Sequence, residues 1–354
     1  MGKLYLKEYL INLFTRFYTT ELCITTTRNC NAFCPTCSSA GKKDGVFLSK
    51  KQGEVILKHR LFNNLDKLII SGGETMLWED LVWFTKEARK RWPANKTQID
   101  IFTNGLDTEK VVNAAKELKN ECIRWHFPLN GFEKTHAKFK GVKGAFEKVT
   151  ATMDELKKMN CTLFCAMLIM KENMHLYQEL MRFVRERYKI LLNIIVPVNT
   201  GIYKGNKLEL PDFDDYYRFF LRYATLTTHG PYKWALEYFI WHVKYRKWMP
   251  CSGAKKRLHL LPDGSLNCCY YREDPASIIG HVTETGIEID ESARKRLRRD
   301  IRKGKCLYPG KGWICNEFMP TNTIRRNVPR LIGWKIMATL LGFLGFKKWN
   351  ITVT

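Results

Sequence analysis

The chain has 354 residues, of which 45% are hydrophobic and 27% are charged. This composition excludes a wholly disordered chain, and it supplies enough apolar side chains for one large domain or two smaller ones. Lysine and arginine outnumber the acidic residues by 59 to 35, and the net charge of +24 indicates anionic partners such as phosphates, nucleic acid or a membrane surface. Half of the excess lies in residues 291–354, which hold 15 basic and 3 acidic side chains.

The N-terminal residues 1–20 mix basic and apolar side chains, and they lack the uninterrupted apolar stretch of a signal peptide. We therefore expect a basic amphipathic extension and a reducing, cytoplasmic location. In that compartment the twelve cysteines are expected to be metal ligands or ordinary buried thiols rather than disulfides.

Strand-like and helix-like stretches alternate between about residues 22 and 225, which predicts βα units around a parallel sheet. Apolar residues at spacings of three and four, such as Val149, Met153 and Leu156, predict helices that bury one face against this sheet. Parallel sheets carry their chemistry at the carboxyl ends of the strands, so the residues just after each strand are the functional candidates. The six expected strands are 22–27, 67–70, 98–103, 123–129, 162–170 and 190–198.

Three cysteines, Cys30, Cys34 and Cys37, follow the first expected strand on one short loop. Pro35 keeps this loop from being helical, and three thiolates on one loop can hold one metal centre. Three ligands suit an iron–sulfur cluster with one open iron. Structural zinc is the alternative, and it would need a fourth ligand from a distant cysteine or histidine.

The spacing Cys-x3-Cys-x2-Cys after the first strand resembles the defining motif of the radical S-adenosylmethionine (SAM) enzymes. A second motif, Gly72-Gly73-Glu74, follows the second strand, where that family binds the methionine amino group of SAM. The two glycines let the backbone approach a ligand closely, and Glu74 can accept a hydrogen bond from an ammonium group. The third strand is followed by residues 103–105, Thr-Asn-Gly, which resemble a Thr-Asn-Gly segment of the family at the same place. A plain turn explains these three residues equally well.

After the fourth strand, the stretch from Asn130 to Val149 resembles family members with cysteine-rich C-terminal extensions. Pro128, Asn130 and Lys140 stand where those members have Ser, Asp and Arg, and Thr36 stands where an aromatic residue is usual. His136 is interpreted as a surface or structural histidine rather than a catalytic one. The resemblance implies contacts with the cofactor for Thr36, Gly72, Gly73, Glu74, Thr103, Asn104, Asn130 and Lys140, and it leaves the catalytic acid or base unidentified.

A second group of cysteines begins with Cys251-x12-Gly264-x4-Cys269, a pattern that predicts a hairpin bringing two thiols together. Cys306 and Cys315 bring the number of thiolates to four, enough for a closed site, with a zinc-ribbon-like site as the alternative. This half resembles the SPASM and Twitch extensions of radical SAM enzymes, which hold auxiliary four-iron clusters, and the one-cluster Twitch arrangement fits better. The choice of Cys269 over the adjacent Cys268 follows from the Gly-x4-Cys count alone.

Residues 292–305 predict a strongly basic helix, for which a solvated face is the usual explanation. Residues 331–346 are apolar except for Lys335 and Thr339, and as a helix they would rise roughly 24 Å, short of the bilayer's hydrocarbon core of about 30 Å. Contact with the inner face of an anionic membrane and packing on the barrel explain this tail equally well.

The expected fold class is α/β: a partial (βα)6 TIM-like barrel, the radical SAM core, at 21–230, then a small Twitch/SPASM-like domain at 231–325 and a basic-apolar tail at 326–354. The resemblance implies a [4Fe-4S] cluster held by Cys30, Cys34 and Cys37, and SAM that is reductively cleaved to a 5′-deoxyadenosyl radical. It also implies an electron donor such as flavodoxin or ferredoxin. Finally, it implies an auxiliary [4Fe-4S] cluster at Cys251, Cys269, Cys306 and Cys315.

The substrate is the least determined part of this prediction. The basic tail favours oxidation or dehydrogenation of a small sugar-like, phosphorylated or lipid-linked molecule, and the alternative is a maturase that modifies a peptide or protein. Nucleic acid is supported only by charge and is not favoured. A zinc-stabilised basic binding protein without turnover is the alternative of another class. The remaining cysteines, Cys23, Cys122, Cys161 and Cys165, are expected to be buried and inert.

Overall fold

The computed structural model describes residues 19–197, 207–226, 253–254, 256–270 and 274–302. Residues 1–18 of the predicted N-terminal extension, the apolar tail and the cysteines Cys251, Cys306 and Cys315 lie outside these residues. The chain divides into two compact units, one containing Phe17–Glu209 with Ser252–Arg299 and one containing Leu210–Cys251. Helix α8 (Phe213–Leu226) belongs to the latter unit, and it begins with the acidic residues Asp214 and Asp215 in its first turn.

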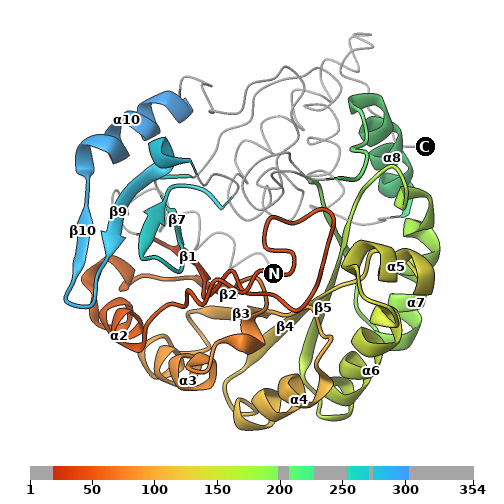
Figure 1. Cartoon of the computed structure of the whole chain (residues 1–354), viewed down its shortest axis with the longest axis horizontal. Coiled ribbons are helices and arrows are strands. Elements are labelled where there is room, and N and C mark those ends of the chain that lie inside the picture. The colour runs from red at the N-terminus through yellow and green to blue at the C-terminus, as the bar shows by residue number, and fades with distance from the viewer. Residues whose placement is uncertain (1–18, 198–206, 227–252, 255, 271–273, 303–354) are drawn as a thin grey trace, which may run out of the picture. The chain divides into compact units, whose positions relative to one another are not determined.

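All six predicted strands are present, and they lie parallel to one another in chain order. Helices follow them along the outer side of the curved sheet (Figure 1). The α/β fold class is therefore confirmed. The strands are β1 (Glu21–Thr25), β2 (Lys67–Ser71), β3 (Gln98–Phe102), β4 (Ile123–Pro128), β5 (Thr162–Leu168) and β6 (Leu192–Ile195). The helices between them are α2 (Lys50–Lys58), α3 (Leu81–Arg91), α4 (Thr108–Glu117), α5 (Glu133–Lys140), α6 (Ala145–Lys158) and α7 (Tyr177–Tyr188), with short 3-10 turns at Arg60–Phe62, Thr75–Leu77 and Met174–Leu176.

The two faces of the sheet differ in chemistry, as strand β4 shows. Ile123, Trp125 and Phe127 are buried on one face, where Phe127 and Val149 of α6 both lie against Gly105. This is the outer face, covered by the helices. Because side chains alternate along a strand, Arg124 and His126 lie on the opposite, inner face. The inner face of β4 therefore carries polar and charged side chains, whereas its outer face is apolar.

Local signals fix the ends of the helices. Ser49 and Gln52 form a capping box at the start of α2, with the Ser49 Oγ accepting from the Gln52 N–H and the Gln52 side chain accepting from the Ser49 N–H. Helix α5 ends at Gly141, whose φ of +61° is left-handed. A Cβ at this position would also lie 2.4 Å from the Phe33 carbonyl oxygen, so only glycine fits there.

Beyond β1 the same sheet continues into the second cysteine region. Strand β7 (Arg257–Leu260) lies parallel to β1, and β8 (Ser265–Asn267), β9 (Ile278–Val282) and β10 (Ile287–Ile289) follow as antiparallel neighbours. A 3-10 turn (Pro275–Ser277) precedes β9, and helix α10 (Glu291–Arg302) follows β10. Strands β7 and β8 form a hairpin around Gly264, and α10 forms the predicted basic helix as far as Arg302. The pairing of the two thiols stays a prediction, because Cys251 lies outside the described residues. The hairpin turn needs Gly264, because its φ is +87° and a Cβ there would lie 2.4 Å from the Val282 carbonyl oxygen.

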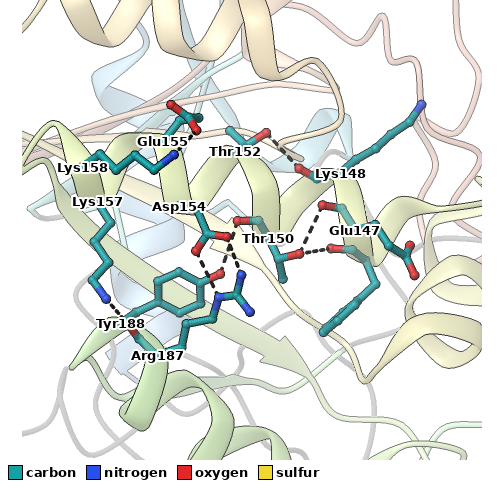
Figure 2. A network of polar contacts seen from close by, with 11 residues as sticks. Glu147, Lys148, Thr150, Thr152, Asp154, Glu155, Lys157, Lys158, Arg187 and Tyr188 are labelled. Atoms are coloured by element: carbon teal, nitrogen blue, oxygen red, sulfur yellow. Dashed lines mark hydrogen bonds and ion pairs between the residues drawn. The ribbon is translucent and has the colours of Figure 1, made fainter.

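The outer surface of α6 and α7 is polar and internally paired (Figure 2). Arg187 donates to Asp154 at 3.0 Å, Lys158 donates to Glu155 at 2.7 Å, and Lys157 donates to the Arg187 carbonyl oxygen. Each of these cations already has a partner, so this face behaves as a solvated helix surface. Within the part of the chain that the structure describes, no helix combines the length and the apolar character needed to cross a bilayer.

Candidate cofactor site

The cysteine loop, residues 30–37, follows β1 and is fastened to two other segments. The Cys30 N–H donates to the Lys42 carbonyl oxygen at 3.0 Å, and the Phe33 N–H donates to the Lys140 carbonyl oxygen at 2.8 Å. Within the loop, the Cys37 N–H donates to the Cys34 carbonyl oxygen at 3.1 Å. These backbone bonds hold the three thiols at the carboxyl end of the sheet, where the sequence places them.

The three thiols influence one another. Burial is the main reason that the pKa of Cys30 is raised to about 12, and the neighbouring Glu74, Cys34 and Cys37 contribute to this shift. Burial likewise raises the pKa of Cys37, and Cys34 adds to the shift. Metal binding would displace these thiol protons. No set of three His, Cys, Asp or Glu side chains in the described ranges converges on a single metal ion, whereas a cluster binds each thiolate through a different iron.

The segment 72–74 packs directly against the start of the cysteine loop. The Gly73 N–H donates to the Thr27 carbonyl oxygen at 2.7 Å, and the Glu74 N–H donates to the Asn29 carbonyl oxygen at 2.8 Å. A Cβ on Gly73 would lie 2.3 Å from that Asn29 oxygen, and one on Gly72 would lie 3.0 Å from the Thr27 oxygen. These glycines therefore permit a close approach to residues 27–29, just before the cysteine loop. This contact fixes the position of Glu74 beside the thiols.

Glu74 presents a buried and firmly oriented carboxylate. Its Oε1 accepts from Thr103 Oγ1 at 2.7 Å and from the Met76 N–H at 3.1 Å, while its Oε2 accepts from the Asn104 N–H at 2.8 Å. Burial raises the pKa of Glu74, and these hydrogen bonds and the charge of Lys140 oppose the shift. Thr103 and Asn104, which sequence reasoning explained equally well as a plain turn, thus orient this carboxylate.

Asn104 also reaches the cysteine loop. Its Nδ2 donates to Asn31 Oδ1 at 2.7 Å and lies 4.0 Å from Cys30 Sγ, while its Oδ1 accepts from the Leu106 N–H at 2.9 Å. The third βα loop is therefore tied to the first. Thr36, at the position before the third cysteine, is buried, with 5% of its surface exposed.

Asn130 ties β4 to β5. Its Oδ1 accepts from the Leu168 N–H at 3.0 Å, and its carbonyl oxygen accepts from Asn173 Nδ2 at 2.9 Å. His136 is fully buried, and its Nδ1 accepts from the Asn130 N–H at 3.0 Å, which places the ring proton on Nε2. Burial holds the pKa of His136 well below its ordinary value. The structure thus gives His136 a structural role in the position of Asn130.

Lys140 supplies a buried positive charge to the site. It is 6% exposed, and its charge lowers the pKa of both Glu74 and Cys37. A carboxylate and an ammonium group beside three thiols suit a zwitterionic ligand, because Glu74 can accept from its ammonium and Lys140 can pair with its carboxylate. These residues fit the methionine part of SAM bound at a cluster.

Sequence reasoning missed a charged network on the inner face of the sheet. Asp100 of β3 is fully buried, and its carboxylate lies 3.1 Å from Lys67 Nζ, 3.1 Å from Arg124 Nε and 3.3 Å from His126 Nε2. The His126 ring is stacked between Phe102 and Phe164, with centroid distances of 4.3 and 4.9 Å. The available signal was the alternation of Arg124 and His126 with apolar residues, which marks a polar inner face.

The second cysteine region is described only in part. Cys268 is buried, with its N–H donating to the Ser277 carbonyl oxygen at 3.1 Å, and Cys269 is half-buried. Among the cysteines assigned no role, Cys23 and Cys165 are buried as expected and Cys161 is half-buried. The expectation is wrong for Cys122, which is exposed because it lies in the turn before β4 with a φ of +50°.

Residues 24–184 match the radical SAM superfamily, and this stretch contains the cysteine loop, Glu74 and Lys140. This part of the chain is a radical SAM domain, and proteins with this domain use a [4Fe-4S] cluster and SAM. The resemblance noted in the sequence is therefore confirmed.

Three known proteins illustrate the similarity. The chain is 22% identical over 290 residues to the sporulation killing factor maturation protein SkfB of Bacillus subtilis (strain 168), covering 79% of this chain and 67% of SkfB. The structure of native anSMEcpe with bound AdoMet and Kp18Cys peptide superposes with a TM-score of 0.59 at 16% identity, covering 85% of this chain and 88% of that one. SuiB of Streptococcus suis bound to precursor peptide SuiA gives a TM-score of 0.55 at 16% identity, covering 75% and 63%. At these identities the two structures show a shared fold.

Proposed function

We propose that this radical SAM enzyme modifies a peptide. One observation carries the assignment of the site: the loop of Cys30, Cys34 and Cys37 lies beside a buried, oriented Glu74 and a buried Lys140. SAM chemistry requires a protein to supply thiolates that hold a cluster. It also requires opposite charges that bind the ammonium and carboxylate groups of the methionine part of SAM.

The residues of this chain bind and orient in the proposed mechanism. When bound, the cluster and SAM supply one-electron reductive cleavage that generates an organic radical. Glu74 would accept from the methionine ammonium of SAM, and Lys140 would pair with its carboxylate. Thr103 and Asn104 keep the Glu74 carboxylate in a single orientation, because each donates a hydrogen bond to it. The burial of these groups excludes water from the reacting centre.

The peptide substrate is favoured over the small sugar-like molecule that the basic tail suggested. SkfB is named a maturation protein, and the solved structures of anSMEcpe and SuiB each contain a peptide. Those names describe the relatives, and they support a peptide substrate for a chain that shares their fold. Oxidation of the substrate remains part of the proposal, to be read from the mass of the product.

The proposal includes an auxiliary cluster at Cys251, Cys269, Cys306 and Cys315. Two observations support this choice of ligand at the hairpin. Cys268 has 2% exposure, while the adjacent Cys269 is more accessible. The predicted Gly264-x4-Cys269 spacing agrees with it.

The first experiment is anaerobic reconstitution with iron and sulfide, followed by reduction with dithionite in the presence of SAM. We expect 5′-deoxyadenosine from the wild type and none from the Cys30→Ala, Cys34→Ala, Cys37→Ala variant, whose iron content should fall by about four per chain. Cys161→Ala is the matched control, because Cys161 is a half-buried thiol outside the site. Zinc without sulfide would instead support the zinc-stabilised binding protein.

The substrate class is tested by the source of the abstracted hydrogen. Reconstituted enzyme is incubated with a mixture of perdeuterated peptides or, separately, with perdeuterated hexose phosphates. Deuterium in 5′-deoxyadenosine from the peptides alone supports the proposal. Transfer from the sugars alone would overturn it in favour of a small substrate.

A further inference from the structure

An exposed ribbon, residues 42–47, runs beside the cysteine loop. All six of its residues are exposed. It is held there by hydrogen bonds along its length, from the Cys30 N–H to the Lys42 carbonyl oxygen at 3.0 Å and from the Gly45 N–H to Asn29 Oδ1 at 3.2 Å. At its far end Thr27 Oγ1 donates to the Val46 carbonyl oxygen at 2.7 Å. The ribbon is thus an ordered surface next to the predicted cluster.

This surface exposes large apolar side chains. The described part of the chain has four exposed large hydrophobic residues, and three of them lie here: Phe33 at 58%, Val46 at 42% and Phe47 at 38%. The Phe33 ring lies against Gly41, where a Cβ would be 2.6 Å from the ring. A folded chain gathers exposed apolar residues where a partner covers them.

Four exposed lysines belong to the ribbon or to segments that contact the cysteine loop. Lys42 and Lys43 begin the ribbon, and Lys143 follows Gly141, which touches Phe33. The Lys207 N–H donates to the Pro35 carbonyl oxygen in the cysteine loop at 3.0 Å. These four lysines form no ion pair with described residues, although other surface lysines of the same unit do, such as Lys138 with Glu172 and Lys171 with Glu209. The one acidic residue of the ribbon is Asp44, so the surface is cationic.

We propose that this face, formed by the ribbon with Phe33, Lys143 and Lys207, is the docking site for an acidic one-electron donor protein of the flavodoxin or ferredoxin class. This inference rests on the proposed function. One electron leaves the donor, which is oxidised, and reduces the cluster held by Cys30, Cys34 and Cys37, with no bond formed or broken.

The location and composition of the surface favour a donor over a peptide substrate. A donor has to approach only the loop that carries the cluster, whereas the reacting carbon of a substrate has to enter the site where the radical would form. Electron-transfer encounters use small interfaces, below about 1,200 Å² in total, and opposite charge accelerates their association. A few exposed apolar side chains together with exposed lysines on the same and adjoining segments fit such an encounter.

The test compares two reductants on the reconstituted, full-length enzyme. Flavodoxin hydroquinone and dithionite are mixed separately with wild type and with the Lys43→Glu, Lys143→Glu variant, and bleaching of the cluster absorbance is followed in time at low salt. We expect the flavodoxin rate constant to fall about tenfold or more in the variant, with the dithionite rate unchanged. The Lys110→Glu, Lys119→Glu variant makes the same charge change on exposed residues of α4 and its end, and it should keep the wild-type rate.

A second variant tests the apolar part. Val46→Ser should weaken chemical cross-linking of flavodoxin to the enzyme severalfold while leaving dithionite reduction unchanged. Flavodoxin rates that agree within twofold in all variants would overturn the docking site, as would a loss confined to binding of an acidic peptide. Failure of dithionite to reduce any cluster in the wild type would instead overturn the proposed function, and the docking site with it.

Discussion

The Asp100 network offers the sharpest test of how the inner face is held together. Asp100→Asn keeps the size of the side chain and removes its charge. The carboxylate is fully buried, while its partners Lys67 and Arg124 have side chains 19% and 28% exposed. The substitution therefore leaves two cations facing a neutral amide, and their partial exposure allows water to hydrate them.

The expected cost follows from this geometry. Removing one partner of a buried ion pair costs about 3–5 kcal/mol, and hydration of the two cations places Asp100→Asn near the lower end, about 3 kcal/mol. The unit that contains Asp100 has roughly 240 residues. For a domain of that size each kcal/mol lowers the melting temperature by about 2–4 °C, so a decrease of about 6–12 °C is expected.

The pH dependence has a definite sign. Burial alone would raise the pKa of Asp100, but Lys67, His126 and Arg124 together hold it well below its ordinary value. A carboxyl group with a depressed pKa stabilises the fold fully above its unfolded pKa of about 3.9, and that contribution disappears as the pH falls through the folded pKa. The difference between wild type and Asp100→Asn should therefore be the same at pH 8 and at pH 5.5.

Thermal unfolding followed by circular dichroism measures this difference. Asp154→Asn is the matched control, because it removes the same charge from a 29% exposed carboxylate paired with Arg187 on the outer surface (Figure 2). An exposed pair contributes about 1 kcal/mol or less. A melting temperature for Asp100→Asn that falls no further than that of Asp154→Asn would refute the assigned role of the network.

Three further substitutions test the candidate cofactor site. Glu74→Gln should weaken SAM binding to the reconstituted enzyme by roughly 10- to 100-fold in calorimetry, because a charge-assisted hydrogen bond contributes about 1.5–3 kcal/mol, while iron content stays unchanged. Gly73→Ala should lower iron incorporation and the melting temperature, because its Cβ would lie 2.3 Å from the Asn29 carbonyl oxygen; Gly286→Ala, with open space around it, should change neither. Asn130→Ala should cost about 1–3 kcal/mol in chemical denaturation by leaving the buried Leu168 N–H without its acceptor, and an unchanged midpoint would contradict that assignment.

The fold could be predicted from the sequence because its signals are local. The alternation of Ile123, Trp125 and Phe127 marks one covered face within a single strand, and the spacing of Gly264 marks the hairpin turn. The cysteine loop and Glu74 could be located for the same reason, since each follows directly after a strand. Patterns of this kind need no knowledge of which strands are neighbours.

The polar networks could not be predicted, because they depend on which residues of neighbouring strands lie opposite one another. Asp100 meets Lys67 and Arg124 only because Ile69 pairs with Asp100 on one side and Asp100 pairs with Arg124 on the other. Asn173 bonds to the Asn130 and Leu168 carbonyl oxygens across 43 and 5 residues of chain. A histidine such as His136 gives no sign in the sequence of whether it binds a ligand or caps a backbone N–H.

The cofactor site depends on how the βα loops are fastened to one another. Gly73 brings the second loop against Asn29, Asn104 ties the third loop to Asn31, and Gly141 lets the end of α5 lie against Phe33. All three contacts reach the cysteine loop or the residue just before it, from three different βα units. Each needs close packing or a buried polar pair, so a change in any one unit displaces the thiols relative to Glu74. The parallel order of β1 to β4 is therefore part of the cofactor site, because it brings these three units to the same edge of the sheet.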